Sequence, residues 1–247
     1  PYNKGGDYRK WYGNNEYVVN WENDGYEIRN FTDGGKKIKS RPQNTQYYFN
    51  KGITWSLFGF ENFGVRYKDY GFIFDVSGSS MFPSPENIYY VTGYLCSNIA
   101  FKFLSLLAPT VNFQIGNIAS LPYKEIDDKS TINNLVKRNI EICKYDWDKH
   151  ETSWDFKNSP IIIENETKIK NSLEKYKEKH SNLRDELRNN EKRLNEIYNN
   201  IFDVQEVDTD VNDRDLTLKQ LENIDIIKEL ISYSVGCMFG RYSLDED

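Results

Sequence analysis

The sequence predicts an α+β fold, with a mixed, β-rich domain over residues 1–127 followed by long coiled-coil helices over residues 128–247. Aromatic residues are concentrated in the first part, which holds 27 of the 37 Trp, Tyr and Phe residues, so disorder is not expected there. The first part carries 13 Lys/Arg against 12 Asp/Glu, and the second carries 19 against 26. The overall charge of −6 is therefore a property of the second part, and it does not exclude binding of an anion by the first.

Short runs of β-branched and aromatic residues, bounded by glycine, predict the strands of the first part. The predicted strands are Tyr17–Val19 and Gly71–Val76, and the predicted turns are Asp24-Gly25, Asp33-Gly34-Gly35 and Lys51-Gly52. Ser84, followed by Pro and Glu, is typical of a helix start, and apolar spacing extends this helix to Leu106 with a break near Ser97. One more strand and turn are predicted at residues 111–116.

The second part is predicted to be helical. Apolar residues mark one amphipathic helix over residues 132–143, and a longer series at alternating steps of four and three is typical of a coiled-coil seam. The seam positions are Ile169, Leu173, Tyr176, His180, Leu183, Leu187, Asn190, Leu194, Ile197 and Ile201. Such a stripe needs a partner helix, and residues 131–147 and 218–239 are the candidates, in an antiparallel coiled coil within the chain or in pairing between chains. His180 and Asn190 are interpreted as polar positions that set the register rather than as ligands.

Several classes of protein are disfavoured by composition. Three widely spaced cysteines (Cys96, Cys143, Cys237) predict neither a disulfide framework nor a metal knuckle, and they fit a reducing, cytoplasmic location. The apolar run at residues 88–108 contains Asn98 and Lys102, so it is interpreted as buried helices rather than as a membrane span. The chain begins at Pro1 without Met, and we expect it to be a piece of a longer polypeptide.

Familiar catalytic motifs are absent from the sequence. It contains no Gly-x-Gly pair, no Gly-x-x-x-x-Gly-Lys loop, no Gly-x-Ser-x-Gly elbow and no adjacent prolines. We therefore predict no catalytic residue, no metal site and no cofactor within this chain. Glu164, Glu166 and Lys168 after an Ile triplet loosely match the acidic residues and lysine of a nuclease, but such triplets also arise in any Glu/Lys-rich helix start.

A basic, amide-rich stretch is the candidate DNA-binding site. It comprises Lys36, Lys37, Lys39, Arg41, Gln43 and Asn44, whose cations suit phosphates and whose amides suit base edges. Arg66 and Tyr67, between two glycines, are further candidates. The alternative interpretation, for both groups, is a solvated hairpin loop.

Several strings, in order along nearly the whole chain, resemble the large adenine-specific DNA methyltransferases of bacteriophage-exclusion (BREX) systems, the PglX family. The similar strings are KWYGNNEYVVNW (10–21), RPQNT (41–45), GITWS (52–56), GFIFD (71–75), ETSWDF (151–156) and VGCMFGRYSLD (235–245). NFQIGNI (112–118) resembles the closing turn of target-recognition domains in those enzymes and in type I and type IIG restriction–modification proteins.

The resemblance implies a role for this piece and supplies no catalytic residue. An upstream domain of the same polypeptide would transfer a methyl group from S-adenosylmethionine to an adenine flipped out of double-stranded DNA. Residues 1–127 would be the target-recognition domain and residues 128–247 a helical spacer, in a phage-defence system with possible further subunits and no membrane association. The alternatives are a coiled-coil protein-interaction module without DNA binding and a stand-alone nuclease.

Overall fold

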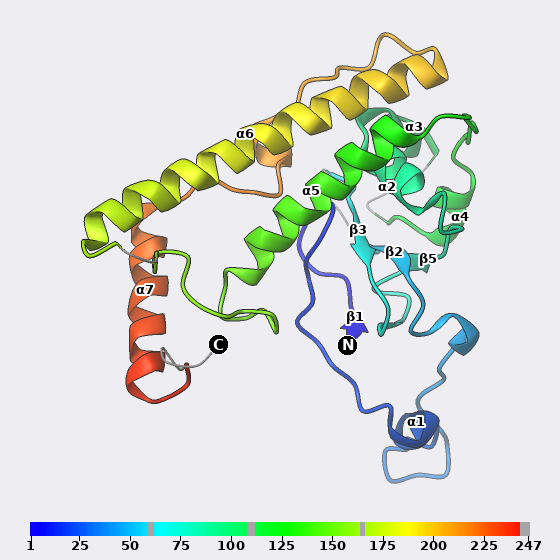
Figure 1. Ribbon diagram of the computed structural model, residues 1–247. Helices are drawn as coiled ribbons and strands as arrows, with labels where there is room; N and C mark the ends of the chain where they lie inside the picture. Colours follow the sequence, from blue (N-terminus) through cyan, green and yellow to red (C-terminus); the bar gives the residue numbers. More distant parts are fainter. Residues whose placement is uncertain (59–61, 108–111, 164–165, 243–247) are drawn as a thin grey trace.

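The computed structural model describes residues 1–58, 62–107, 112–163 and 166–242, and it confirms the predicted α+β fold (Figure 1). The described helices are α1 (Glu22–Arg29), α2 (Ile88–Cys96), α3 (Asn98–Leu107), α4 (Ile115–Ala119), α5 (Ser130–Asp148), α6 (Ile169–Phe202) and α7 (Asn223–Met238), with 3₁₀ turns at Thr45–Tyr47 and Asp213–Asp215. The described strands are β1 (Tyr2–Asn3), β2 (Gly52–Trp55), β3 (Val65–Lys68), β4 (Ile73–Phe74) and β5 (Ser80–Met81). The strands and short helices lie at one end of the molecule, and α5 and α6 extend from it (Figure 1).

The central sheet has the order β3-β2-β5, with both pairs antiparallel. Strand β2 is buried on both faces, and its Ile53 and Trp55 belong to the main hydrophobic core. The indole N–H of Trp55 donates to the main-chain oxygen of Phe113 at 2.8 Å, which ties the segment before α4 to the sheet. A second, two-stranded sheet joins β1 and β4 in parallel.

Two of the strand predictions need correction. The strand predicted at 71–76 is present as Ile73–Phe74, but the one at Tyr17–Val19 is wrong, because only Tyr17 makes a single bridge, to Tyr2, and Val18 is exposed. Asn112 likewise makes one bridge, to Phe58, and the chain then enters helix α4 instead of a turn. Residue 111 of that predicted strand lies outside the described residues.

The predicted break in the apolar helical run is confirmed at Ser97, which is extended (ψ 155°) and separates α2 from α3. The Ser97 hydroxyl donates to the main-chain oxygen of Tyr94 at 2.6 Å, so the interruption is hydrogen-bonded within the core. The helix begins later than predicted: Asn87 N–H closes a turn on the Ser84 oxygen, and α2 starts at Ile88.

Helix α6 has 34 residues and runs antiparallel to α5 (Figure 1). Lys149, at the end of α5, lies against His180, whereas Arg138 pairs with Glu186 farther along α6. Asn190, on the predicted seam, donates to Asn139 of α5 at 3.0 Å. The buried face of α6 also contains Glu191, Asn195, Tyr198 and Asn199, so it is wider and more polar than the predicted seam.

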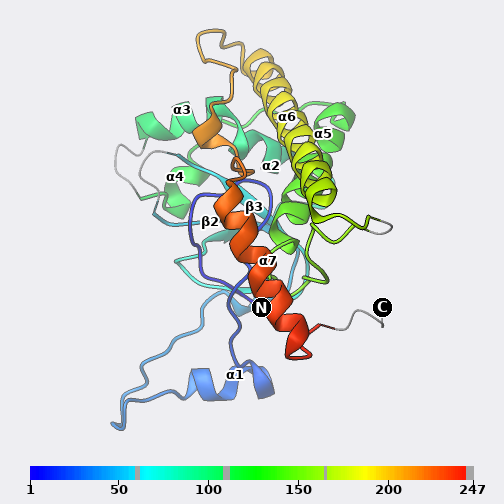
Figure 2. The ribbon, with the colours of Figure 1, turned by 90° about the vertical axis from the view of Figure 1, so that its left-hand side faces the viewer.

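Helix α7 lies beside the N-terminal end of α6 (Figures 1 and 2). Ile226 packs with Tyr176 of α6 and Ile161 in a small second cluster. The main hydrophobic core, by contrast, contains residues from both sides of the predicted domain boundary at residue 127, including Trp55, Val136 and Leu194. The division of the chain into two domains stays a prediction.

Candidate nucleic-acid interface

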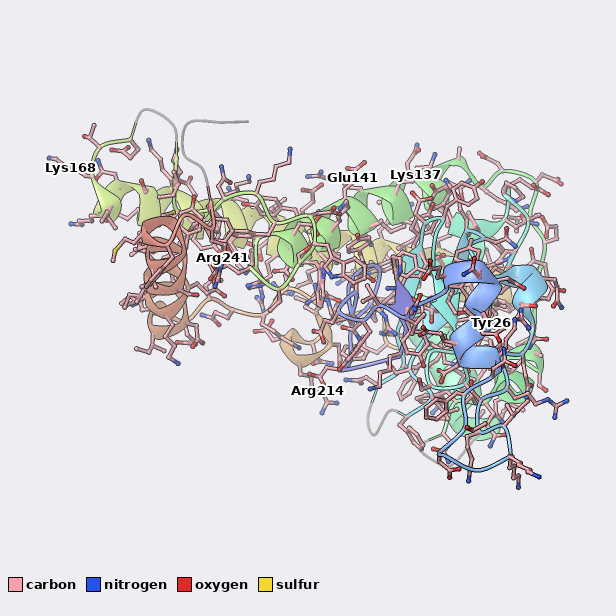
Figure 3. All side chains as sticks on the ribbon, turned by 90° about the horizontal axis from the view of Figure 1, so that it is seen from below. Tyr26, Lys137, Glu141, Lys168, Arg214 and Arg241 are labelled. Atoms are coloured by element: carbon pink, nitrogen blue, oxygen red, sulfur yellow. The ribbon has the colours of Figure 1, made fainter. Side chains whose placement is uncertain are left out.

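The predicted basic stretch lies on a projection formed by α1 and residues 30–47, which stands away from the rest of the molecule in two views (Figures 1 and 2). Figure 3, in which Tyr26 marks α1, shows the same projection from below. Six predicted residues are exposed there: Lys36, Lys37, Lys39, Arg41, Gln43 and Asn44. Residues 30–47 contain these four cations and one carboxylate, that of Asp33.

A small hairpin supports the tip of the projection. Thr32 bridges to Ile38, and Lys39 N–H donates to the Phe31 oxygen at 2.8 Å. The Lys39 ammonium is 2.9 Å from Asp33, so the single acidic residue of the segment neutralises one cation. The other three cations, Lys36, Lys37 and Arg41, make no ion pair with any carboxylate of the described residues, and their charge faces solvent.

The base of the projection is held by aromatic contacts. Tyr48 is buried, and its ring packs edge-on against Trp21, 5.1 Å away, and against Phe74, 5.2 Å away. Phe49 N–H donates to the Phe72 oxygen at 2.8 Å, which joins the end of the segment to the residues before β4. Asn44 has a left-handed backbone (φ 57°) directly before the 3₁₀ turn, and this conformation is one that Asn tolerates well.

Arg66 and Tyr67 are not brought to this exposed surface. Both lie in β3, where Arg66 is 1 % exposed and Tyr67 is buried and stacks on Tyr89 with the ring centroids 5.7 Å apart. Burial raises the pKa of Tyr67 to about 12, and burial lowers the pKa of Arg66 to about 10. Their part in DNA binding stays a prediction, and Arg66 lines a separate cavity described below.

Sequence reasoning missed a buried group of charges that joins the N-terminal segment to the long helices. Glu191 of α6 accepts hydrogen bonds from Lys10 Nζ at 2.9 Å and from the indole N–H of Trp11 at 2.7 Å. All three residues are at least 95 % buried. Burial disfavours the Lys10 ammonium, but the facing Glu191 carboxylate outweighs burial and raises the pKa of Lys10.

A second buried group lies at the end of α5. The Asp146 carboxylate is 2.8 Å from Arg9 and 2.8 Å from Lys149. Burial alone would raise the pKa of Asp146, and the two cations reverse this and lower it. No sequence signal distinguishes Asp146 or Glu191 from the many solvated acids of these helices.

The candidate nuclease residues that the structure describes, Glu166 and Lys168, do not form a recognisable centre. Glu166, in the loop before α6, pairs with Lys175 of α6 at 2.7 Å. Glu164 lies outside the described residues. Residues 161–163 form turn and irregular structure rather than a strand. Within the described ranges, no group of three or more His, Cys, Asp or Glu side chains could hold a metal ion. None of the helices in those ranges is long and apolar enough to cross a membrane.

Comparison with known proteins identifies relatives over the entire chain. The adenine-specific methyltransferase BrxX of Escherichia coli O9:H4 (strain HS) is 35 % identical over 267 aligned residues, covering 100 % of this chain and 21 % of BrxX. The chain is a homologue of one region of the BrxX and PglX methyltransferases. PglX of Lacticaseibacillus casei (strain Zhang), also described as an adenine-specific methyltransferase, is 34 % identical over 254 residues, covering 99 % of this chain and 21 % of PglX. No family model matches the chain.

These relatives confirm the resemblance to PglX-type enzymes that the sequence strings indicated. The chain spans about a fifth of the length of BrxX and PglX, so the activity named for them belongs to proteins about five times as long.

Proposed function

We propose that this chain is the DNA target-recognition and spacer region of an adenine-specific methyltransferase of phage defence. Its substrate would be double-stranded DNA in the cytoplasm. A methyltransferase domain elsewhere in the same polypeptide would bind S-adenosylmethionine and carry out the chemistry, with other defence-system subunits as possible partners. The observation that carries the proposal is the exposed projection, on which six of the eight predicted DNA-contacting residues lie together.

The projection offers both kinds of side chain that DNA recognition needs: cations for phosphates and amides for base edges. Lys36, Lys37 and Arg41 have no carboxylate partner among the described residues, so their charge is available to phosphates, and such contacts fix position without selecting sequence. Gln43 and Asn44 are exposed and uncharged, and their amides can donate and accept at base edges. In this proposal residues 1–127 select the sequence and residues 128–247 set the distance between the parts of the enzyme.

A salt titration of duplex binding tests the positional contacts. Lys36→Gln and Lys37→Gln should each weaken binding across all sequences and reduce the slope of log K against log salt by about 0.9 per phosphate contact. Lys170→Gln is the matched control, because Lys170 is also an exposed lysine but lies on α6, in the proposed spacer. Unchanged affinity and slope in both loop variants would remove the projection from the interface.

A map of methylated adenines tests sequence selection. In cells that carry the full-length protein, Gln43→Ala or Asn44→Ala should broaden the methylated motif without abolishing methylation. Exchange of residues 1–127 for those of a relative should replace one motif by another. An unaltered motif after the exchange would show that recognition resides elsewhere.

A protein-interaction module without DNA binding is the alternative function. Helix α7 favours it, because its exposed apolar residues recur at helical spacing: Ile224, Ile227, Ile231, Val235 and Met238. The seam of α6 favours it less, since that face packs against α5 within the same chain. Sedimentation of the chain with and without Ile231→Glu separates the two functions, because the alternative expects self-association or partner binding through α7 and no affinity for DNA.

A further inference from the structure

A cavity of about 410 Å³ lies beside the central sheet, with a buried arginine in its wall. Arg66 of β3 and Ser56, just after β2, line it together with Gly6, Asp7, Tyr8, Phe58, Asn62, Phe63, Gly64 and Phe113. The cavity is separate from the exposed projection, since none of residues 30–47 lines it.

Among the residues that the structure describes, the Arg66 guanidinium has no counter-ion. Its Nη1 and Nη2 atoms are each 3.4 Å from the Ser56 hydroxyl oxygen, a weak contact, and its buried Nε has no hydrogen-bond partner. No carboxylate of residues 1–58, 62–107, 112–163 or 166–242 forms an ion pair with it, and the neighbouring charge with the largest effect on its pKa, Arg9, is also a cation. A buried, unpaired charge is costly to a folded protein.

Other buried cations of this chain are compensated. Lys10 is paired with Glu191 and Lys149 with Asp146. Lys68, two residues along β3 from Arg66, donates to the main-chain oxygen of Gly13 at 2.9 Å and to the side-chain oxygen of Asn15. Arg66 is therefore the exception among these four cations, and it lines the cavity beside the central sheet.

We propose that this cavity binds a phosphoryl group, whose oxygens accept hydrogen bonds from the Arg66 guanidinium. The planar fork of arginine donors matches the oxygens of phosphate, and the bond gains strength where water is excluded. The hydroxyl of Ser56 adds a polar group beside the guanidinium, and the rings of Phe58 and Phe113 offer an apolar wall to a base attached to the phosphate. Asp7 is the one carboxylate among the described lining residues, and its side chain is exposed, so solvent screens its repulsion of an anion.

Two sources of phosphate share this chemistry: a backbone phosphate of duplex DNA, and a free phosphate or mononucleotide. The first rests on the proposed function, and the second does not. The test therefore uses inorganic phosphate as its probe and duplex DNA as a separate arm.

Thermal unfolding of the chain in inorganic phosphate and in chloride, at equal ionic strength, is the primary measurement. We expect phosphate to raise Tm of the wild type with a saturable dependence, and Arg66→Met to lose this increment while its Tm in chloride equals or exceeds that of the wild type. Lys36→Met, which removes an exposed cation, should keep the whole increment. The general stabilising effect of phosphate on proteins is common to all variants, so the difference between them reports the cavity.

Ser56→Asp provides a test that does not depend on tolerance of Arg66→Met. The Ser56 hydroxyl oxygen is 3.4 Å from both Nη atoms of Arg66, so a carboxylate at position 56 would supply the missing counter-ion. This variant should unfold at a higher temperature in chloride and should show no saturable response to phosphate. The proposal would be overturned if phosphate raised Tm equally in the wild type, Arg66→Met and Ser56→Asp. It would also be overturned if phosphate did not raise Tm of the wild type.

The duplex arm assigns the source. If Arg66→Met also reduces the salt slope of duplex binding by about 0.9, the cavity takes a backbone phosphate. Unchanged duplex binding together with loss of the phosphate increment assigns free phosphate or a mononucleotide. If the wild-type chain shows the phosphate increment but binds no duplex, the proposed function is refuted and the cavity proposal stands. If it binds duplex but shows no increment, the cavity proposal is refuted and the proposed function stands.

Discussion

Glu191→Ala should be among the most destabilising single substitutions in this chain. The Glu191 side chain is 2 % exposed, and its two oxygens accept separately from Lys10 Nζ and from the indole N–H of Trp11. Truncation therefore leaves a buried ammonium without a counter-ion and a buried N–H without an acceptor.

The expected loss of stability has two parts, the cost of the unpaired Lys10 ammonium and the cost of the unpaired Trp11 N–H. Breaking a buried ion pair by removing one partner costs about 3–5 kcal/mol. Lys10 can avoid a larger cost by losing its proton, and deprotonation of a lysine of ordinary pKa at pH 7 costs about 5 kcal/mol. The unpaired Trp11 N–H adds about 1–3 kcal/mol. A loss of about 5 kcal/mol is expected, which is comparable with the whole stability of many domains.

Urea unfolding followed by Trp fluorescence measures this loss, with Glu186→Ala as the matched control. Glu186 lies on the same helix and pairs with Arg138 at 2.7 Å, but both side chains are exposed, so its loss should cost about 0.5 kcal/mol. The double variant Lys10→Met, Glu191→Gln should recover most of the stability, because it removes the ammonium and keeps an acceptor for Trp11. Equal stability of Glu191→Ala and Glu186→Ala would refute the argument that the buried pair is desolvated.

Two further predictions concern packing and pH. Gly93→Ala would place a Cβ 2.8 Å from the Tyr198 hydroxyl oxygen in the core and should cost about 1–3 kcal/mol, whereas Gly116→Ala, which meets nothing within 4 Å, should be neutral or stabilising in the same urea assay. Burial, followed by the nearby Lys149 ammonium, lowers the pKa of His180, so the unfolded chain binds a proton at this residue more readily than the folded one. Stability should therefore fall as pH decreases below about 6.5, the ordinary pKa of His, with a slope of up to 1.4 kcal/mol per pH unit that is lost in His180→Asn. A pH profile of His180→Asn identical to that of the wild type would contradict this assignment.

The parts of the fold that sequence predicted are those in which local pattern and burial agree. The length of α6 follows from its apolar spacing, and the break between α2 and α3 follows from the polar Ser97-Asn98 pair within an apolar run. The exposure of residues 36–44 follows from a composition that no core could accommodate.

Arg66 shows why the remainder could not be predicted. In the alternating pattern of β3, Val65 and Tyr67 suggest the buried face, and Arg66 and Lys68 suggest the solvated face. The N-terminal segment pairs with the edge of β3, where Trp11 N–H donates to the Val65 oxygen and Tyr67 N–H donates to the Trp11 oxygen, both at 2.8 Å. It also contacts the second face, where Lys68 Nζ donates to the Gly13 oxygen at 2.9 Å. A contact between residues more than 50 positions apart leaves no periodic trace in either segment.

Trp11 is the point at which the sheet and the long helix are joined, and the two kinds of contact at it have different consequences. Its main chain is bonded to β3, and its indole N–H is bonded to Glu191 of α6, so a shift of the strand along the helix would break buried, directional hydrogen bonds. The base of the exposed projection is held by the main-chain hydrogen bonds of Phe49 and by ring contacts around Tyr48, and the ring contacts tolerate small rotations because apolar contact is not directional. The molecule therefore combines a hydrogen-bonded junction between β3 and α6 with an attachment of the cationic projection that includes ring contacts, and in the proposed function this would let the projection adjust to a groove while its distance from the rest of the protein stays fixed.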